Sequence, residues 1–438
     1  MDHEGSTPQL EGYSDWLQQT MSTWKVPGLA VGIIKDGQVV FLEGLGVRDT
    51  DSALPVTPNT LFALASGTKA FTTMALGLLA DEGKLDWDAP VRDVVPSFKL
   101  YDVVATERLT PRDLVTHRSG LPRHDIAWYQ SPFSRAELWR RLQYLQPNKD
   151  IRTDWQYQNL MYMAAGCVLE HITGMSWEDF VRSRIFQPLD MTRSNFAISD
   201  SQADQDHALP YKEIEDVVKR VPFYEQFAIG PAGSINTCVA DMTRWLRLHL
   251  GKGELDGQRL VSEAQVRAMY VPQMVIQRPS KYDEILHENY GLGWSVSTYR
   301  GYEFVQHGGN IDGFSTMTTL MPRQNISVVA LCNINGSSLP WIACVNAYER
   351  LLGIDETPWS DRYQADRAAA KAGEEAGKTK DAADRVESTA PSHALDAYTG
   401  EYEHPGYGSL YVDEVDGALS MRLNTLPFSV EHYHYDTF

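Results

Sequence analysis

The stretch FALASGTKAFTTMALGLLADEG, residues 62–83, decides the fold that we expect for this chain. After Ser66, apolar side chains recur at the three- and four-residue spacing that places them on one face of a helix: Phe71, Met74, Ala75, Leu78 and Leu79. Gly83 can end this helix. The stretch therefore predicts a buried helix that starts near Ser66 and carries Ser66 and Lys69 one turn apart on the same face.

This pair of side chains can carry nucleophilic chemistry. A serine hydroxyl needs a neighbouring base and hydrogen-bond donors for the oxyanion that develops, and a helix N-terminus supplies an exposed N–H and a favourable dipole. A buried Lys69 can lose its proton or lower the pKa of a neighbour. The alternative is a capping serine with a lysine that reaches solvent. Ser22 and Lys25 have the same spacing late in an amphipathic helix, and we assign them to surface structure.

A second motif is Tyr157-Gln158-Asn159, before another apolar stretch with helical spacing, residues 159–174. A tyrosine titrates near pH 10 when unperturbed, but a cation such as Lys69 stabilises its phenolate and makes it a proton shuttle. Asn159 can donate to a substrate carbonyl and hold the lysine. The alternative is a core tyrosine followed by an asparagine that caps the helix.

A third motif, His307-Gly308-Gly309-Asn310, follows a strand-like run and precedes another, Phe314 to Met321. Glycines beside a strand let a substrate or another backbone approach closely. The open N–H groups of a strand edge can hold an acyl substrate in extended form, and the N–H of Asn310 can be a second oxyanion donor beside that of Ser66. The alternative is a Gly-rich bulge with a turn histidine.

Composition and patterning outline the rest of the chain. Its 438 residues are 43% hydrophobic and 22% charged, as in a globular protein of enzyme size, and the formal net charge of -19 disfavours nucleic acid as a partner. We expect a catalytic domain over residues 1–354, with an α/β lobe from about 1–85 and 270–354 and a helical lobe from about 86–269. Residues 355–392 predict a charged linker, and 393–438 a small β domain that we expect to be truncated, because about 45 residues is short for one.

Other features bear on cofactors and location. The four cysteines form no C-x-x-C pair, and neither a zinc motif nor a phosphate-binding loop occurs, so we expect no disulfide scaffold, no metal and no cofactor. The N-terminus lacks a basic start followed by an apolar run, and no apolar run of about 18 residues occurs. We therefore expect a cytoplasmic protein without a membrane partner. A leader removed before residue 1 would leave no trace here.

Taken in order, the three motifs resemble those of the serine β-lactamase and penicillin-binding-protein-like hydrolases. This family includes class C β-lactamases, DD-peptidases, D-aminopeptidases and family VIII esterases. The resemblance covers about residues 10–353 and extends to LTPRDLVTHRSGLP (109–122) and YGLGW (290–294), and the tail resembles a β domain appended to many such proteins. It implies an α+β fold, in which an antiparallel sheet flanked by helices and an all-helical lobe precede a small all-β domain.

The resemblance also implies roles for the motif residues. Ser66 would be the nucleophile, with Lys69 and Tyr157 sharing the general-base and general-acid work. Asn159 would orient the lysine and the substrate, and the N–H groups of Ser66 and Asn310 would hold the oxyanion. To HRSG, residues 117–120, we assign the shaping of the turn after a helix.

One departure from the family pattern affects the expected substrate. β-Lactamases usually have lysine where this chain has His307, and a histidine is cationic only below about pH 6.5, so a carboxylate anchor is less secure. This looks more like D-aminopeptidase-type hydrolases. We therefore expect hydrolysis of an amide, peptide or ester bond in a small molecule or short peptide, ahead of β-lactams. The alternatives are an acyltransferase of the same fold and an inactive binding protein on this scaffold, and the oligomeric state stays open.

Overall fold

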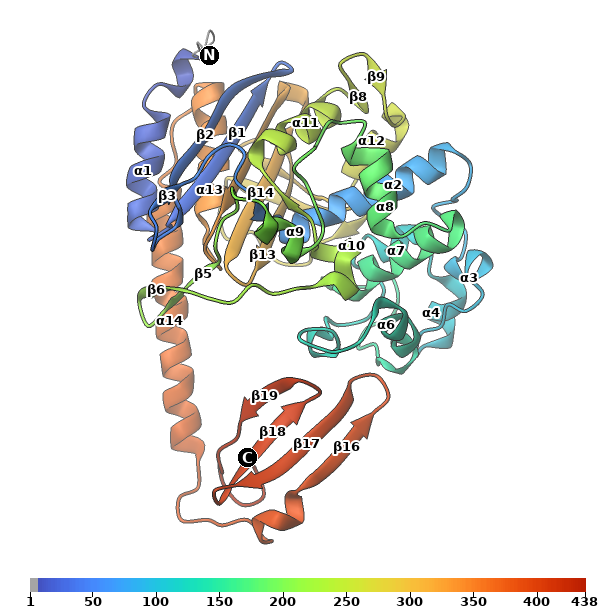
Figure 1. The fold of residues 1–438 in the computed structure, drawn as a ribbon, viewed down its shortest axis with the longest axis vertical. Helices are drawn as coiled ribbons and strands as arrows, with labels where there is room; N and C mark the ends of the chain where they lie inside the picture. The colour runs from blue at the N-terminus through green and yellow to red at the C-terminus, as the bar shows by residue number, and fades with distance from the viewer. Residues whose placement is uncertain (1–6) are drawn as a thin grey trace. The chain divides into compact units, whose positions relative to one another are not determined.

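The computed structural model describes residues 7–438, which form two compact units. The first consists of the described residues up to Arg123 together with Gln146–Thr357, and the second of His124–Leu145 with Pro358–Phe438. Figure 1 shows the helices and strands with the labels used below.

A nine-stranded sheet forms the framework of the first unit, in the order β10-β11-β12-β13-β14-β15-β1-β2-β3. Every neighbouring pair is antiparallel. The strands are β1 (Gly28–Lys35), β2 (Gln38–Asp49), β3 (Leu54–Pro55), β10 (Met274–Val275), β11 (Ile285–Tyr290), β12 (Ser295–Tyr299), β13 (Tyr302–Ile311), β14 (Phe314–Met321) and β15 (Ile326–Cys332). Because β1 pairs with β15, for example Leu29 with Cys332, the sheet joins two distant parts of the sequence.

Helices cover this sheet, which explains why its central strands β14, β15 and β1 are almost entirely buried. β15 is buried along its whole length. α13 (Leu339–Leu352) packs on β14 and β15, and Tyr13 of α1 (Tyr13–Thr23) donates a hydrogen bond of 2.7 Å to Ala343 O of α13. α11 (Val239–Leu250) packs on β1 and β15. Figure 1 shows α1 and α11 on opposite sides of the sheet.

The helical part of this unit is built around α2 (Thr68–Asp81) and α7 (Asn159–Thr173), which pack against each other and against α10 (Gly230–Gly233). α2 is buried from Thr68 to Leu79, so the helix predicted from residues 62–83 is confirmed. The other helices of the unit are α3 (Val91–Val94), α4 (Val103–Arg108), α5 (Pro111–Leu114), α8 (Trp177–Val181), α9 (Ile198–Ala203) and α12 (Glu263–Tyr270). The two-stranded sheets pair β4 (Phe62–Ala63) with β7 (Asn236–Thr237), β5 (Tyr211–Ile214) with β6 (Val217–Arg220), and β8 (Glu254–Leu255) with β9 (Gln258–Arg259).

The second unit contains α6 (Arg135–Arg141), α14 (Trp359–Asp384) and a four-stranded antiparallel sheet. Its strands are β16 (Gly400–His404), β17 (Gly408–Val415), β18 (Ala418–Leu423) and β19 (Leu426–Ser429). Within this unit, His124 Nδ1 lies 2.6 Å from Tyr407 Oη, and Arg141 Nη1 donates to Pro405 O at 2.8 Å. Residues 124–145, which fall inside the predicted helical lobe, therefore pack with the C-terminal sheet.

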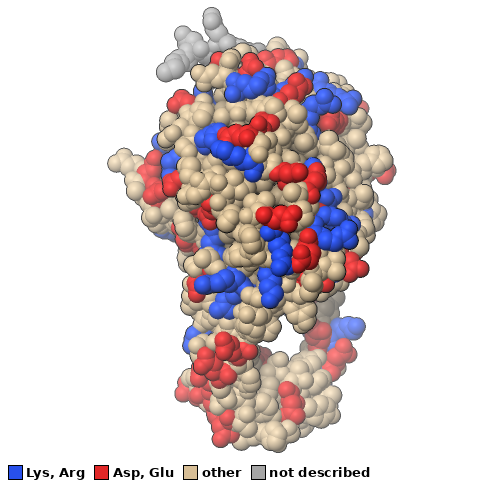
Figure 2. Space-filling view, turned by 90° about the vertical axis from the view of Figure 1, so that its right-hand side faces the viewer, with Lys and Arg blue, Asp and Glu red and all other residues tan. Residues whose placement is uncertain are grey.

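The fold class expected from the sequence is confirmed: a large antiparallel sheet with helices, followed by an all-β sheet of four strands. Between residues 7 and 438, no helix is both long and apolar enough to cross a membrane. Figure 2 shows basic and acidic side chains interspersed over one face of the chain.

Candidate active site

Ser66 stands just before α2, in the single 3-10 turn that spans Ala65–Gly67 and follows β4. The backbone ahead of it is fixed because Thr316 Oγ1 donates to Leu64 O at 3.0 Å. Ala65 has a left-handed φ of +50°, which costs a non-glycine residue about 1–2 kcal/mol and must be held by its surroundings. Ser66 itself is partly exposed, so a substrate can reach it.

Lys69 is completely buried beside this serine. Its Nζ lies 3.1 Å from Ser66 Oγ, 2.8 Å from Asn159 Oδ1 and 2.9 Å from Ala232 O. The amide and main-chain oxygens can only accept, so they hold two of the N–H groups. The remaining position of the nitrogen faces Ser66 Oγ, where an ammonium donates a proton and a neutral amine accepts one. α2, α7 and α10 thus meet at this one atom.

Asn159 is the first residue of α7, and another residue caps that helix. The cap is Gln158, whose Oε1 accepts from Leu160 N–H at 2.8 Å and whose Nε2 donates to Pro122 O at 2.7 Å. The alternative interpretation of Asn159 as the capping residue is therefore wrong. Because Gln158 takes the cap, the amide oxygen of Asn159 can bind Lys69.

Tyr157 lies close to two basic side chains. Its ring centroid is 4.8 Å from Lys69 Nζ and 5.2 Å from the guanidinium carbon of Arg123. Cations at this distance are attracted by the electron-rich face of the ring. Tyr157 is partly exposed, like Ser66. The first two motifs are therefore brought together.

The third motif lies on β13, beside the backbone that leads to Ser66. A Cβ on Gly309 would lie 2.2 Å from Leu64 O and 2.4 Å from Thr316 Oγ1. No side chain fits into this space, so glycine is what lets the strand approach the serine.

β13 has an open edge at this point. β14 pairs with residues 307–311 on one side, whereas the pairing with β12 on the other side ends at Gln306 with Ser295. Within the described sheet, residues 307–311 therefore have no strand partner on the β12 side. Such an edge can accept an extended chain as an additional strand.

The backbone and the side chain of Asn310 point to different parts of the structure. Ile311 pairs with Phe314 across a two-residue turn, and the closing pair of such a hairpin exchanges backbone hydrogen bonds. Successive residues of an antiparallel strand point their N–H groups to alternate sides, so the N–H of Asn310 points to the open edge. Its side-chain Oδ1 accepts from Gly336 N–H at 2.8 Å. The side chain thus holds the strand end, while the N–H lies on the edge that β12 leaves unpaired.

His307 is a neutral link in this site. Its Nδ1 lies 2.7 Å from Gly308 O, and its Nε2 lies 3.0 Å from Tyr290 Oη. Burial, with the nearby charge of Lys69, lowers its pKa to about 3. The neutral ring therefore carries its proton on Nδ1 and accepts from Tyr290 at Nε2. With this lowered pKa, His307 stays uncharged at neutral pH.

Three contributors to the site were not predicted from the sequence. Ala232 contributes a main-chain carbonyl, which no side-chain pattern marks. Tyr290 and His117 lie in YGLGW and HRSG, so the sequence signal existed, but it did not indicate their contacts with His307 and with the backbone around Tyr157.

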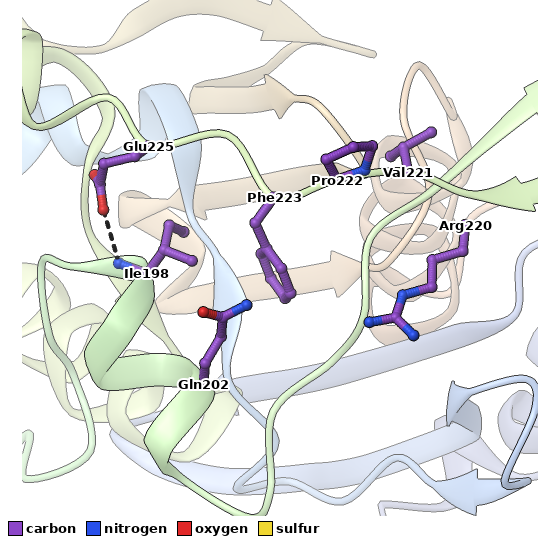
Figure 3. A pocket seen from close by; sticks show the side chains of 7 residues that line it. All are labelled: Ile198, Gln202, Arg220, Val221, Pro222, Phe223 and Glu225. Carbon is purple, nitrogen blue, oxygen red and sulfur yellow. Dashed lines mark hydrogen bonds between the residues drawn. The ribbon is translucent and has the colours of Figure 1, made fainter.

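A cavity of about 600 Å³ lies elsewhere on the first unit, between α9 and the segment after β6 (Figure 3). It is lined by Ile198, Gln202, Arg220, Val221, Pro222, Phe223 and Glu225. Glu225 Oε2 accepts from Ile198 N–H at 3.0 Å and so closes one side of it. None of the predicted site residues lines this cavity.

Comparisons with known proteins match both parts of the chain. A family described as Beta-lactamase matches residues 14–343, and a domain of unknown function, DUF3471, matches residues 384–438. The chain is 28% identical over 460 residues to "Unguisins hydrolase ungD'" of Aspergillus campestris (strain IBT 28561), which covers 98% of this chain and 84% of that protein. It is 26% identical over 331 residues to "Protein flp" of Staphylococcus aureus (strain NCTC 8325 / PS 47), which covers 74% of this chain and 63% of that protein.

Two solved structures share the fold. The octameric penicillin-binding protein homologue from Pyrococcus abyssi has a TM-score of 0.72 at 24% identity, over 94% of this chain and 87% of that one. A penicillin binding protein from Bacillus halodurans has a TM-score of 0.62 at 22% identity, over 76% of this chain and 98% of that one.

Proposed function

The chain belongs to the beta-lactamase family, and from this membership we propose that it is a serine hydrolase that cleaves an amide, peptide or ester bond through an acyl-enzyme at Ser66. The observation that carries the proposal is the Lys69 nitrogen, 3.1 Å from Ser66 Oγ and held by two carbonyl oxygens from α7 and α10. The printed name of the Aspergillus campestris relative, a hydrolase matched over nearly the whole chain, supports hydrolysis as the reaction.

In acylation, Lys69 reacts in its deprotonated form and accepts the proton of Ser66 as Oγ attacks the substrate carbonyl carbon. Its other two contacts keep the lone pair aimed at the serine. The N–H groups of Ser66 and Asn310 stabilise the oxyanion of the tetrahedral intermediate. As this intermediate collapses, Tyr157 gives its phenolic proton to the leaving nitrogen or oxygen, and the ammonium of Lys69 stabilises the phenolate.

Deacylation returns every proton. The phenolate of Tyr157 accepts a proton from water, and the hydroxide attacks the ester carbonyl of the acyl-enzyme. When the second tetrahedral intermediate collapses, Ser66 Oγ leaves and takes back the proton from Lys69. The site then again contains a phenol, a neutral amine and a hydroxyl, so the cycle needs no group beyond these side chains and water.

The geometry favours an extended, amide-containing substrate. The open edge at residues 307–311 offers N–H and C=O groups to a chain laid along it. His307 has a pKa of about 3 and both its ring nitrogens are engaged, so it offers no positive charge to a substrate carboxylate at neutral pH. This supports peptides and amides that lack a carboxylate at this position, ahead of β-lactams.

Intact-mass spectrometry after treatment with a fluorophosphonate or an activated ester tests the proposal. We expect one adduct on Ser66 and none in Ser66→Ala. The matched control is Ser22→Ala, because Ser22 has the same spacing to Lys25 but is exposed on α1; this variant should label fully. Labelling that persists in Ser66→Ala would overturn the proposal. Product analysis with an added amine acceptor then separates hydrolysis from acyl transfer.

A further inference from the structure

His117 holds the backbone on both sides of Tyr157. Gln156 N–H donates to the main-chain oxygen of His117 at 2.8 Å, and Gln158 N–H donates to His117 Nδ1 at 3.0 Å. These two donors flank Tyr157 in the sequence, while His117 lies 41 residues from Gln158 along the chain. One residue therefore fixes the path of the backbone that carries the phenol.

The side chain of His117 also packs against the phenol itself. The centroids of the His117 and Tyr157 rings are 4.3 Å apart, with an interplanar angle of 37°. His117 is completely buried, so its ring is a fixed surface against which the tyrosine is oriented. The contact restricts the tyrosine side chain in addition to its backbone.

A rigid frame supports this histidine. Asp113, which is also completely buried, receives Arg118 Nε at 2.6 Å and Arg152 Nη2 at 2.7 Å. The same two arginines are joined through the backbone, where Arg152 N–H donates to Arg118 O at 2.8 Å. The segments that carry His117 and Tyr157 are thus tied together at a second place.

The contact with Gln158 requires a neutral imidazole. Nδ1 accepts from Gln158 N–H, so the single proton of the neutral ring is on Nε2, which has no hydrogen-bond partner among residues 7–438. Burial, with the nearby charges of Lys69 and Arg123, lowers the pKa of His117 well below 6.5. A protonated ring would present an N–H to the N–H of Gln158, and the contact would be lost.

We propose that His117 is a positioning residue that orients the phenol of Tyr157 toward the Ser66 site through these two backbone contacts and the ring contact. The inference rests on the proposed function, because it takes Tyr157 as the proton donor to the leaving group. It goes beyond the turn-shaping role that the sequence indicates for HRSG. His117 does have a left-handed φ of +58°, so the test must separate the turn from the contacts.

Two substitutions make this separation. His117→Gly adopts the left-handed turn without strain but removes the side-chain acceptor and the ring. His117→Asn also tolerates this φ, and its amide oxygen can replace Nδ1 as acceptor for Gln158 N–H. If the turn alone matters, both variants keep full activity. If His117 positions Tyr157, we expect kcat to fall about 100-fold in His117→Gly and less than tenfold in His117→Asn.

Substrates with different leaving groups distinguish a loss of proton donation from a general structural defect, because a structural defect would lower the acylation rates of both substrates alike. An anilide leaves only when its nitrogen is protonated, whereas a p-nitrophenolate leaves without a proton. We therefore expect the loss in acylation rate to be at least tenfold larger for a p-nitroanilide than for the p-nitrophenyl ester of the same acyl group. Equal losses on both substrates, or none on either, would overturn the inference. Full labelling of Ser66 by a fluorophosphonate shows that the nucleophile is intact and keeps failure of the proposed function distinguishable.

A double-mutant cycle covers the case in which His117→Gly does not fold. Tyr157→Phe removes the phenolic proton donor that His117 is proposed to position. We therefore expect His117→Asn to lower the rate of anilide cleavage in the native background but to change it less than twofold when Tyr157 is already Phe. Additive losses would show that His117 acts independently of Tyr157, and the inference would fall.

Discussion

Lys69 Nζ lies 3.1 Å from Ser66 Oγ, and the two oxygens that hold the same nitrogen come from α7 and α10. The proposed nucleophile and its proposed base are therefore neighbours within about one helical turn, but the direction of the lysine nitrogen is set by parts of the chain far away in sequence. Activity should depend on this tertiary arrangement as much as on the S-x-x-K motif itself.

Replacing Lys69 by Met tests the base. Met has a similar volume but cannot accept the serine proton, so we expect kcat to fall by about 10²–10⁴-fold. The loss leaves Asn159 Oδ1 and Ala232 O without a donor, at about 1–3 kcal/mol each, while removal of a buried amine offsets part of this cost. Steady-state kinetics and urea unfolding measure the two effects. If the variant kept a kcat within tenfold of that of the native protein, Lys69 would not be the general base.

Asn159 and its neighbour Gln158 form a matched pair. Asn159→Ala removes an acceptor from Lys69 and should lower kcat by about 10–100-fold, because the amine loses its fixed direction. Gln158→Ala removes the helix cap and should cost about 1 kcal/mol of stability with a smaller effect on kcat. Thermal unfolding and kinetics of both variants check this division. If kcat fell more in Gln158→Ala than in Asn159→Ala, the contact of Asn159 with Lys69 would not be the one on which activity depends.

Gly309 and Gly308 make a second matched pair on β13. Gly309→Ala forces a Cβ to 2.2 Å from Leu64 O, so the strand must move away from the serine. We expect a loss of about 1–3 kcal/mol in stability and a large loss of activity. At Gly308 the nearest atom is the flexible Met317 Cε at 3.0 Å, so Gly308→Ala should be far milder. Equal tolerance at both positions would contradict the close approach of β13.

Local patterns explain what the sequence predicted. The helix after Ser66 and the strand character of β13 and β14 follow from apolar spacing, and these elements form as expected. The contacts that direct Lys69, His307 and His117 do not follow from such patterns, because they join residues through tertiary packing. The pKa of His307 is an example: it falls to about 3 because the folded chain buries the ring, and no local sequence pattern predicts this burial.

Three buried histidines predict how stability depends on pH. Burial lowers the pKa of His249 to about 3, that of His307 to about 3 as well, and that of His117 well below 6.5. Below about pH 6.5 the unfolded chain binds protons at these positions that the folded chain does not, so the free energy of unfolding falls as pH falls toward 3. The slope is about 1.4 kcal/mol per pH unit for each histidine.

His249 lies outside the candidate site and provides the control for this slope. Its Nδ1 is 2.5 Å from Tyr270 Oη. Urea unfolding between pH 7 and 5 should give a shallower pH dependence in His249→Asn, by about 1.4 kcal/mol per unit at the acid end. An unchanged slope would mean that this histidine is already protonated in the folded protein.

Because His307 is uncharged at neutral pH, we expect little preference for a substrate that carries a carboxylate. A charged hydrogen bond contributes about 1.5–3 kcal/mol, which corresponds to roughly a 10–100-fold preference, and a neutral imidazole with both nitrogens engaged forfeits it. We therefore expect kcat/KM at pH 7 to differ less than about threefold between a peptide with a free C-terminal carboxylate and its carboxamide. His307→Lys restores the residue usual in β-lactamases and should raise the preference for the carboxylate. A tenfold preference in the native protein would show that another cation binds this group and would contradict the substrate class proposed from His307.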